Sequence, residues 1–467
     1  MVLVSANPMT AAPATADRTQ LRLEMLFDRG TMRITGTCED VRVARGRVDG
    51  TPAIAFATEP ARRGGAVGVE GCQAIADAID AAVRERSPVV GLWHSGGARL
   101  DQGVAALDAV GSVFAAIVRA SGQIPQISVV LGPAAGGAAY GPALTDIVVM
   151  SADARIFVTG PDVVREVTGE DVDMCRLGGP EPHARRSGLA HIVTDDDAAA
   201  LRTARTLVAL LGRPGRLDAT AVVDVDLSQY ATAGRRGPNA GQLVEDLLDA
   251  PGTELHARWA PNVMTVLGRF GGRTVGVIAN NPARLGGCLD VAGADKAARF
   301  VRMCDGLGFP LIVVVDVPGS LPGAGQEWDG IVRRGAKLLH AFAEAVVPRV
   351  TLITRRAYGS MSIAFNSRSL GASAVLAWPD AEIAPLSAPA MVDVLHRRTI
   401  AAAAPDQRQH VRDRLIREHR TTDGGLARAL EVGVVDEIVS PSLTRSRIAQ
   451  ALAAAPKGRG AHTNIPL

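Results

Sequence analysis

The hydrophobic and polar positions along the chain follow the same order twice. A short apolar strand, at 53–57 and again at 275–279, leads into a glycine-rich loop and then into an amphipathic helix, AIADAIDAAVRER in one copy and ADKAARFVRMCDGLG in the other. In the first helix the apolar residues recur at i, i+3, i+4 and i+7. Two more apolar strands follow in each copy, and each ends in a loop. Strands that alternate with helices predict an α/β fold on a parallel sheet, with working loops at the strand ends.

The two copies align residue by residue. GRVDGTPAIAFATEPARRGGAVGVEG, at 46–71, matches GRFGGRTVGVIANNPARLGGCLDVAG, at 268–293, without a gap. The segment 89–97 matches 311–319 at the same offset, and 124–137 matches 347–360 after a slip of a single position. Chance similarity does not keep register through three strands, so we interpret the chain as a duplicated domain.

The repeat sets the expected domain boundaries. Residues 1–20 form a loose tail, 21–245 the N-terminal domain with a linker at its end, and 246–467 the C-terminal domain. The stretch GRPGRLDATAVVDVDLSQYATAGRRGPNAGQ has the Gly, Pro and polar residues of a linker. A chain of 467 residues also suits two domains of roughly 200 residues better than one core.

Charge and composition narrow the class of protein. The 50 Lys and Arg residues nearly balance the 48 Asp and Glu residues, so no overall field attracts nucleic acid or an anionic membrane. Apolar residues make up 47% of the chain and aromatic residues only 3%, which suits helices packed closely on parallel strands. We therefore expect an α/β enzyme rather than a nucleic-acid-binding protein.

The cysteines and the N-terminus predict a cytoplasmic protein. The five cysteines form no CxxC pair and no disulfide framework, so we expect buried thiols in a reducing compartment. MVLVSA is too short for the apolar region of a signal peptide. No apolar run reaches the roughly 20 residues that a membrane-spanning helix requires.

Two loops of small residues are the candidates for chemistry. SGGAR (95–99) and AAGGAAYG (134–141) each follow a predicted buried strand, where backbone N–H groups can point at a ligand with no Cβ in the way. Two such donors on a thioester oxygen would stabilise the enolate that forms when a proton leaves the α-carbon or CO2 joins it. The alternative is that these glycines only allow a helix to pack closely on the sheet.

Side chains give weaker signals. The sequence holds no GxSxG elbow, P-loop, HExxH motif or metal-binding cluster, so no metal site is expected. His94, just before SGGAR, is a possible base, but the second copy has Asp316 there, which favours a residue that orients its loop. Arg62, Arg63 and, in the second copy, Arg284 either bind phosphate through charge-assisted bonds or lie on a solvated loop.

Several motifs together resemble one enzyme family. From about residue 20 to the terminal NIPL the chain is similar to the carboxyltransferase (β) subunit of actinobacterial acyl-CoA carboxylases. The motifs that carry the resemblance are AVGVEG, WHSGGARL, PQISVVLGPAAGGAAYGPALTD, FVTGPDVVREVTGEDV, LGGP, GVIANNP, DKAARFVRMCD, VVDVPGSLPGAGQE, RRGAKLLHAF, NSRSLGA and AWPDAE.

The resemblance implies two tandem crotonase-like domains, a ring-shaped homohexamer, and active sites where the N-terminal half of one subunit meets the C-terminal half of another. Acyl-CoA would bind the first copy and carboxybiotin the second, with no cofactor held permanently. The sequence holds neither a biotinyl-lysine segment nor an ATP-binding carboxylase. A separate α subunit that carries the biotin carboxylase and biotin carrier is therefore implied as a partner.

The resemblance also implies roles for residues. Gly136 and Gly137 would hold the thioester oxygen, while Gly359 and Ser360 lie where the family uses Gly-Gly-Ala to hold biotin. Ile363 lies at the position that shapes acyl choice in the family. The remaining residues expected at the substrates are Gly96, Gly97, Ala98, Arg99, Ala138, Tyr140, Arg62 and Met361.

The second copy departs from the family pattern at its loop. Family members read YGGAY where this chain reads YGSMS at 358–362, and PLSAPAM at 385–391 replaces a glycine-rich helix start. A positive φ at Ser360 or Met361 would cost roughly 1 kcal/mol or more, and the Met side chain would take space left for a ring. Pro389 removes an amide donor, which is harmless in the first turn of a helix.

Three functions are compatible with this sequence. The first is a working carboxyltransferase on acetyl-CoA or propionyl-CoA, which the intact first copy favours. The second is a biotin-independent malonyl- or methylmalonyl-CoA decarboxylase that uses the same enolate chemistry in reverse. The third is a non-catalytic ring subunit that binds partners.

Overall fold

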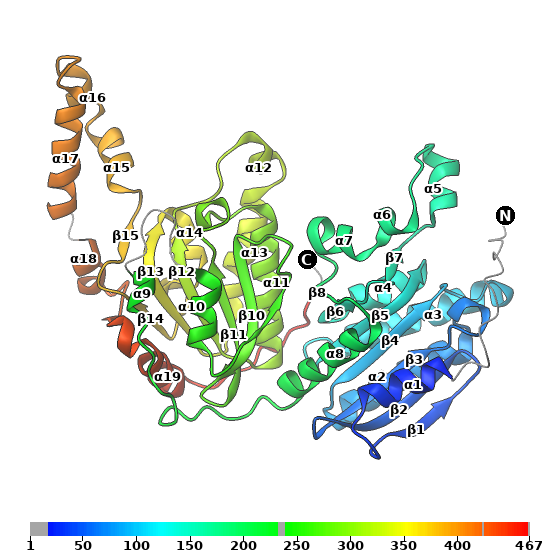
Figure 1. The fold of residues 1–467 in the computed structure, drawn as a ribbon. Coiled ribbons are helices and arrows are strands. Elements are labelled where there is room, and N and C mark those ends of the chain that lie inside the picture. Colours follow the sequence, from blue (N-terminus) through cyan, green and yellow to red (C-terminus); the bar gives the residue numbers. More distant parts are fainter. Residues whose placement is uncertain (1–16, 232–238, 423–424, 466–467) are drawn as a thin grey trace.

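The computed structural model describes residues 17–231, 239–422 and 425–465, which form two eight-stranded sheets side by side with helices on their faces (Figure 1). The first sheet has the order β1-β2-β3-β4-β5-β6-β8, with β7 beside β5. The second has the order β16-β14-β13-β12-β11-β10-β9, with β15 beside β13.

The bounds of the elements are as follows. The strands are β1 (Arg33–Thr37), β2 (Val41–Val48), β3 (Thr51–Thr58), β4 (Val89–Ser95), β5 (Gln126–Ala135), β6 (Ile147–Met150), β7 (Arg155–Phe157), β8 (Ile192–Val193), β9 (Thr253–Leu255), β10 (Val263–Phe270), β11 (Arg273–Asn280), β12 (Leu311–Val317), β13 (Arg349–Tyr358), β14 (Ala374–Ala377), β15 (Glu382–Ala384) and β16 (Glu437–Ile438). The helices of the first half and the connection are α1 (Arg18–Leu26), α2 (Val69–Glu85), α3 (Gly103–Ala120), α4 (Gly137–Ala143), α5 (Pro161–Thr168), α6 (Met174–Gly178), α7 (Pro180–Pro182), α8 (Asp197–Gly212), α9 (Ser228–Ala231) and α10 (Ala240–Leu247). Those of the second half are α11 (Val291–Leu307), α12 (Ala324–Trp328), α13 (Ile331–Glu344), α14 (Gly359–Ala364), α15 (Ala388–Leu395), α16 (Arg397–Ala402), α17 (Arg408–Thr422), α18 (Gly425–Glu431) and α19 (Thr444–Ala454).

The two sheets repeat each other in strand order and in register. Both sheets also shift register at the equivalent point of their two central strands. The equivalent pairs are Val89–Gln126 and Leu311–Arg349 before the shift, and Ser95–Ala134 and Val317–Ala357 after it. These pairs join the same positions that the sequence repeat aligns, including its slip of a single position, so the predicted duplication is confirmed.

The alternation of strands and helices predicted parallel sheets, but both sheets are mixed. β1, β2 and β3 run antiparallel to one another, as do β9, β10 and β11. The physical reason is short turns, because Asp49-Gly50 and Gly271-Gly272 join their flanking strands with positive φ at both residues. The strands from β3 to β6 and from β11 to β14 are parallel.

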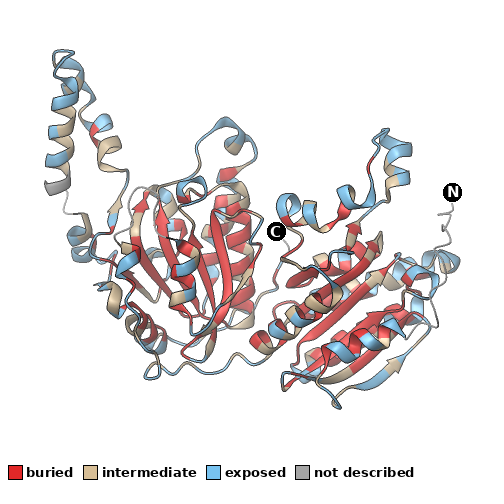
Figure 2. Cartoon of the chain, viewed as in Figure 1, coloured by how far each residue is buried: buried red, intermediate tan, exposed pale blue. Residues whose placement is uncertain are grey.

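The core is layered and continuous between the halves. One apolar layer lies under α2 and α3 on the first sheet, and another lies under α10 and α19 on the second. The largest layer joins the other face of the first sheet, α8, α11, α13 and the near face of the second sheet. Figure 2 shows the buried residues concentrated in both sheets, whereas the arm of α15, α16 and α17 is mostly exposed or intermediate.

The helical stretch Leu100–Ala120 modifies the expectation about membrane spans. By length and composition alone it is long and apolar enough to cross a membrane, and only 28% of it is buried. It contains α3, which joins the adjacent parallel strands β4 and β5 and packs on α2. A helix in that place covers one face of a sheet, and its other face is exposed at Leu100, Val104 and Leu107.

Several expectations about segments need adjustment. Residues 1–16 of the expected tail and 232–238 of the expected linker lie outside the described residues, and α1 already begins at Arg18. The other linker residues lie against the second half, where Leu227 and Tyr230 join its apolar layer. The cysteines are free, and the expectation of buried thiols is confirmed for Cys72 and Cys304. It is wrong for the half-buried Cys38 and Cys288 and for Cys175, which is exposed beside the Arg155 guanidinium.

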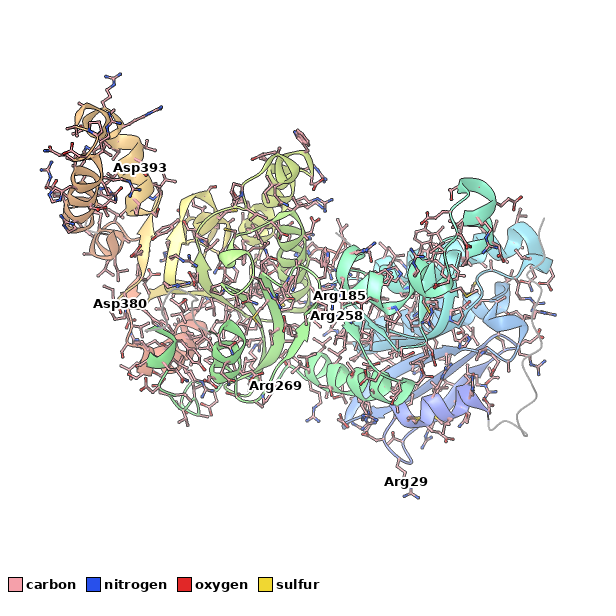
Figure 3. All side chains as sticks on the ribbon, turned by 45° about the horizontal axis from the view of Figure 1, so that its top comes forward. Arg29, Arg185, Arg258, Arg269, Asp380 and Asp393 are labelled. Atoms are coloured by element: carbon pink, nitrogen blue, oxygen red, sulfur yellow. The ribbon has the colours of Figure 1, made fainter. Side chains whose placement is uncertain are left out.

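Polar contacts also hold the halves together. Glu181 forms ion pairs with Arg185 of the first half and Arg258, which lies between β9 and β10, and the two arginines lie close together in Figure 3. The C-terminal segment crosses back from α19 to the first half. There Arg459 donates to the carbonyls of Gly122 and Gln123, and its Nε donates to the carbonyl of Gly306 at 2.7 Å.

Candidate functional site

The loop after β4 presents one backbone donor of the candidate site. The Val67 amide donates to the Gly97 carbonyl at 2.8 Å, and the Arg99 amide donates to the Val67 carbonyl at 3.0 Å. This bridge leaves the Ala98 amide on the opposite side of the strand. The Gly97 amide donates to Ser95 Oγ at 3.2 Å. The neighbouring Ala98 amide has no acceptor among the described residues.

The loop after β5 presents a second donor. Gly136 has a φ of +58° and its amide donates to the Phe157 carbonyl on β7 at 3.1 Å. Gly137 is the first residue of α4, and no acceptor for its amide occurs among the described residues. The structure therefore revises the expected pair of donors, since the Gly136 amide is used inside the fold. Ala98 and Gly137 are the free donors of the two neighbouring strand ends.

A small apolar cavity of about 30 Å³ lies directly behind these loops. It brings together the predicted residues Gly97, Gly137 and Ala138 with side chains of α2 and α3. Burial, followed by the charge of Asp40 and the neighbouring Cys38, raises the pKa of the Cys72 thiol in its wall to about 11. Cys72 is therefore a neutral wall residue at pH 7 rather than a nucleophile.

The other predicted residues of the first half lie around this point. Tyr140 is exposed on α4 and meets Phe114 edge to face at 6.2 Å between ring centroids. The Gly96 amide donates to the Gly64 carbonyl at 3.0 Å. Arg62 is 64% exposed and its nearest carboxylate oxygen, on Glu39, is 3.8 Å away, so its guanidinium is available to a ligand.

Arg99 is engaged with carboxylates of its own half. Its Nη2 lies 2.7 Å from Asp101, and its Nη1 lies 3.2 Å from Glu39 and 3.7 Å from Asp40. The hydrogen bond from this guanidinium lowers the pKa of Asp101. These contacts suit a residue that shapes the loop.

His94 has the geometry of a loop-orienting residue. Thr58 Oγ1 accepts from its amide at 2.9 Å and donates to its carbonyl at 3.0 Å. The ring lies over Gly132, where an added Cβ would come within 2.3 Å of Nδ1. Burial and then the charge of Arg22 lower its pKa to about 4, so the ring is neutral and a weak base at pH 7.

The second half repeats the arrangement of donors. The Leu289 amide donates to the Gly319 carbonyl at 3.1 Å, and the Leu321 amide donates to the Leu289 carbonyl at 2.7 Å, which leaves the Ser320 amide on the other side. Ser360, the counterpart of Gly137, likewise has no acceptor for its amide among the described residues. Sequence reasoning missed Ser320, although the repeat aligns it with Ala98 and so points to it.

The divergent loop of the second half is not strained. Gly359 has a φ of +65°, like Gly136, whereas neither Ser360 nor Met361 has a positive φ. Met361 packs against the largest apolar layer. This contact does not support the expectation that its side chain takes the space left for the biotin ring. Ile363 is 47% exposed. Pro389 lies in the first turn of α15, as expected.

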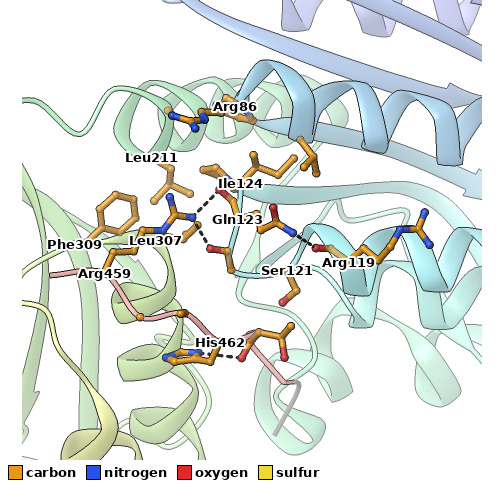
Figure 4. Close-up of a pocket in the computed structure, with 18 of the residues that line it drawn as sticks. Arg86, Arg119, Ser121, Gln123, Ile124, Leu211, Leu307, Phe309, Arg459 and His462 are labelled. Atoms are coloured by element: carbon orange, nitrogen blue, oxygen red, sulfur yellow. Dashed lines mark hydrogen bonds between the residues drawn. The ribbon is translucent and has the colours of Figure 1, made fainter.

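A much larger pocket, of about 1000 Å³, lies elsewhere. Pro88 and Pro125, which precede β4 and β5, line it together with the C-terminal segment (Figure 4). The candidate loops follow the same strands. The pocket therefore lies at the opposite end of the sheet from the backbone donors.

Comparison with known proteins identifies this arrangement. Residues 24–463 match the family model described as the carboxyl transferase domain. The chain is 55% identical to the biotin-dependent acetyl-/propionyl-coenzyme A carboxylase beta6 subunit of Mycobacterium tuberculosis over 96% of both chains, and 52% identical to the propionyl-CoA carboxylase beta chain of Rhodococcus erythropolis over 98% of this chain and 99% of that one.

The fold is similar to a solved structure of transcarboxylase 12S, described as a hexamer with methylmalonyl-coenzyme A and methylmalonic acid bound. The TM-score is 0.89 at 36% identity, over 95% of this chain and 90% of that one. The two sheet domains are therefore crotonase-like, as the resemblance implied. With its duplicated fold and its two loops of backbone donors, the chain belongs to the carboxyl transferase family, as an acyl-CoA carboxylase β subunit.

Proposed function

We propose that this carboxyltransferase moves a carboxyl group from carboxybiotin to the α-carbon of a short acyl-CoA, acetyl-CoA or propionyl-CoA. Carboxybiotin is supplied by a separate biotin-bearing α subunit, and the chain holds no permanent cofactor. The bond between the carboxyl group and the biotin nitrogen breaks to give CO2, that nitrogen takes the proton from the α-carbon, and the α-carbon of the resulting enolate bonds to the CO2. Negative charge therefore passes through the thioester oxygen. Amide donors fixed by the fold stabilise that charge without reorganising.

One observation carries the proposal. At equivalent strand ends of the two halves, the amides of Ala98 and Gly137 and those of Ser320 and Ser360 have no acceptor among the described residues. We assign the first pair to the thioester oxygen and the second to the ureido oxygen of biotin. Arg62 beside the first loop is a candidate for the CoA phosphates, because its guanidinium is exposed.

The size of the cavity supports a short acyl group. About 30 Å³ behind Gly97 and Gly137 accommodates a group about the size of one or two water molecules. The side chains around it include Ile75 and Trp93, which are both buried. A long acyl chain would have to leave by another route.

The arrangement of the sheets supports an assembly of several copies. In Figure 1 the two sheets lie side by side, and each has its own loops at the ends of its parallel strands. We propose that a reaction that joins ligands from both halves uses the second half of another copy. We propose a cytoplasmic homohexamer, in which a neighbouring subunit covers the exposed face of α3. The 12S relative is described as a hexamer.

The deciding experiment gives the purified protein malonyl-CoA with and without a biotinylated α subunit. Carboxyl transfer that requires the α subunit, in either direction, is the expected result. Release of CO2 from malonyl-CoA without biotin, and no transfer with it, would contradict the proposal and favour the decarboxylase. No turnover in either assay by a folded assembly would favour a non-catalytic subunit.

A further inference from the structure

The candidate loops of the two halves are supported by different donors. In the first half the Gly96 amide donates to the Gly64 carbonyl at 3.0 Å and ties the loop around η1 (Arg63–Gly65) to the end of β4. The second half has Pro318 at the place of Gly96. Proline has no N–H, so this bond cannot form there.

A side chain takes the place of the missing amide. Arg356 Nη2 donates to the carbonyl of Gly286, the counterpart of Gly64, at 3.0 Å. Arg356 lies on β13 shortly before Gly359, where the first half has Pro133. The first half therefore has its donor after β4 and a proline on β5, whereas the second half has a proline after β12 and its donor on β13. The loop carbonyl accepts a hydrogen bond in both halves.

A buried carboxylate fixes the direction of this arginine. Asp316, only 3% exposed, accepts from Arg356 Nε at 2.8 Å through one oxygen. Its other oxygen accepts from Arg355 Nε at 2.9 Å and Nη2 at 2.7 Å. The Asp316 amide donates to Asn280 Oδ1 at 3.2 Å, so the ends of β11, β12 and β13 meet at this point. Charge-assisted bonds from planar guanidinium groups give such a cluster a defined geometry.

The bonded loop directly supports the backbone donor of the second half. It contains η4 (Leu285–Gly287) and continues to Leu289, whose two backbone bonds to Gly319 and Leu321 enclose Ser320. At Gly287 an added Cβ would lie 2.6 Å from the Asp316 carbonyl oxygen, so the loop lies tightly against the end of β12. Displacement of the loop would move the Ser320 amide with it.

We propose that Arg356 is a positioning residue for the biotin-side loop, supplying the hydrogen bond that Pro318 cannot. Asp316 holds Arg356 in place. Arg356 acts through the loop and through β13 and does not touch the substrate. This role rests on the proposed function, because it assumes that biotin uses the donors of the second half.

The test uses the full-length assembled protein and carboxyl transfer from malonyl-CoA or methylmalonyl-CoA to free biotin. Arg356→Gln should lower the rate roughly 10- to 100-fold, since small misplacements of a site cost that much. The KM for the acyl-CoA should stay unchanged because its loops lie in the first half. Arg355→Gln is the matched control, because Arg355 bonds the same carboxylate but, within the part of the chain that the structure describes, no loop carbonyl. Its rate should stay within about 3-fold of wild type.

A rescue separates positioning from general damage. Pro318→Gly restores the amide that the first half has, so it should recover most of the rate when added to Arg356→Gln. Amide hydrogen exchange of residues 285–289 should rise in Arg356→Gln and return towards wild type in the double variant. Equal losses in Arg355→Gln and Arg356→Gln, or a folded double variant without recovery, would overturn the role of Arg356. If the wild-type protein transfers no carboxyl group to biotin, the proposed function is contradicted instead. The hydrogen exchange of residues 285–289 then tests by itself whether Arg356 holds the loop.

Discussion

At the scale of single residues, the candidate chemistry depends on amides rather than on side chains. Gly137 has a free amide, and an added Cβ there would meet Val110 Cγ1 at 3.1 Å. Gly137→Val should therefore lower kcat roughly 100-fold, the loss typical of one oxyanion donor, in an assembly that stays folded. Steady-state kinetics and size-exclusion chromatography measure both outcomes.

The control for this variant is Gly36→Ala on β1, the edge strand of the first sheet. An added Cβ at Gly36 meets only the Val43 side chain, at an ordinary contact distance of 3.6 Å, so activity should match wild type. Near-normal activity of Gly137→Val would mean that the thioester binds elsewhere.

The divergent residues of the second loop lead to a different expectation from the one that the sequence suggested. If Ser360 and Met361 closed the biotin side, as the sequence left open, Ser360→Gly with Met361→Ala would restore or raise carboxylation. Because neither residue has a positive φ and Met361 packs on the core, we now expect no gain in rate and a loss of about 1–2 kcal/mol in the free energy of unfolding. A clear rise in carboxylation would show that the wild-type loop obstructs biotin after all.

At the scale of elements, the repeat made the fold predictable and left the details of the site open. Register through three strands predicted both sheets, and the glycines marked both loops. The direction of each amide depended on contacts that no pattern encodes. The Gly136 amide, which the sequence predicted as a donor to the substrate, donates instead to the carbonyl of Phe157. Phe157 lies on a short strand that follows α4 and β6 in the chain. That Arg356 replaces the hydrogen bond that Pro318 cannot make is visible only when both halves are compared in three dimensions.

The C-terminal segment is an element that sequence pattern did not reveal, because it has no regular structure. Arg459 lies in this segment and donates hydrogen bonds to backbone carbonyls of both halves. Arg459→Met should lower the free energy of unfolding by about 1–2 kcal/mol, since bonds to a charged donor are lost at partly exposed positions. Arg447→Met is the comparison, because Arg447 pairs with Glu437 inside the second half and should cost less. Thermal unfolding of both variants measures the difference, and equal losses would contradict a role in joining the halves.

At the scale of the whole molecule, the halves also meet through a buried cluster of titratable groups. His191 of the first half and His256, which follows β9, stack with ring centroids 4.0 Å apart, and the His256 amide donates to the His191 carbonyl at 2.8 Å. Lys296 donates to the His256 carbonyl at 2.9 Å, and Arg299 donates to the Thr145 carbonyl at 2.8 Å. The cluster is therefore rich in positive charge and has little room for more.

Burial lowers the pKa of His256 to about 3, with further lowering by Lys296 and Arg299, and burial lowers that of His191 in the same direction. In the unfolded chain each imidazole titrates near 6.5. Between these values the unfolded state binds more protons, so this contribution to stability is complete above pH 6.5 and is lost as the pH falls towards 3. Burial raises the pKa of Asp146 and Glu254, and those groups act in the opposite direction.

Because the carboxyl groups oppose the histidines, the test compares two proteins rather than one pH curve. His256→Gln keeps an amide that can donate to the Gly188 carbonyl, which lies 2.7 Å from His256 Nε2, but it cannot take up a proton. Relative to wild type, the variant should lose less stability between about pH 6 and pH 4, and the difference should approach about 1.4 kcal/mol per pH unit, the value for one proton. Urea unfolding followed by tryptophan fluorescence measures both curves, and one of the four tryptophans, Trp259, meets His256 edge to face at 5.2 Å. Parallel curves for the two proteins would mean that His256 already binds its proton in the folded state, and the junction between the halves would then not limit stability in acid.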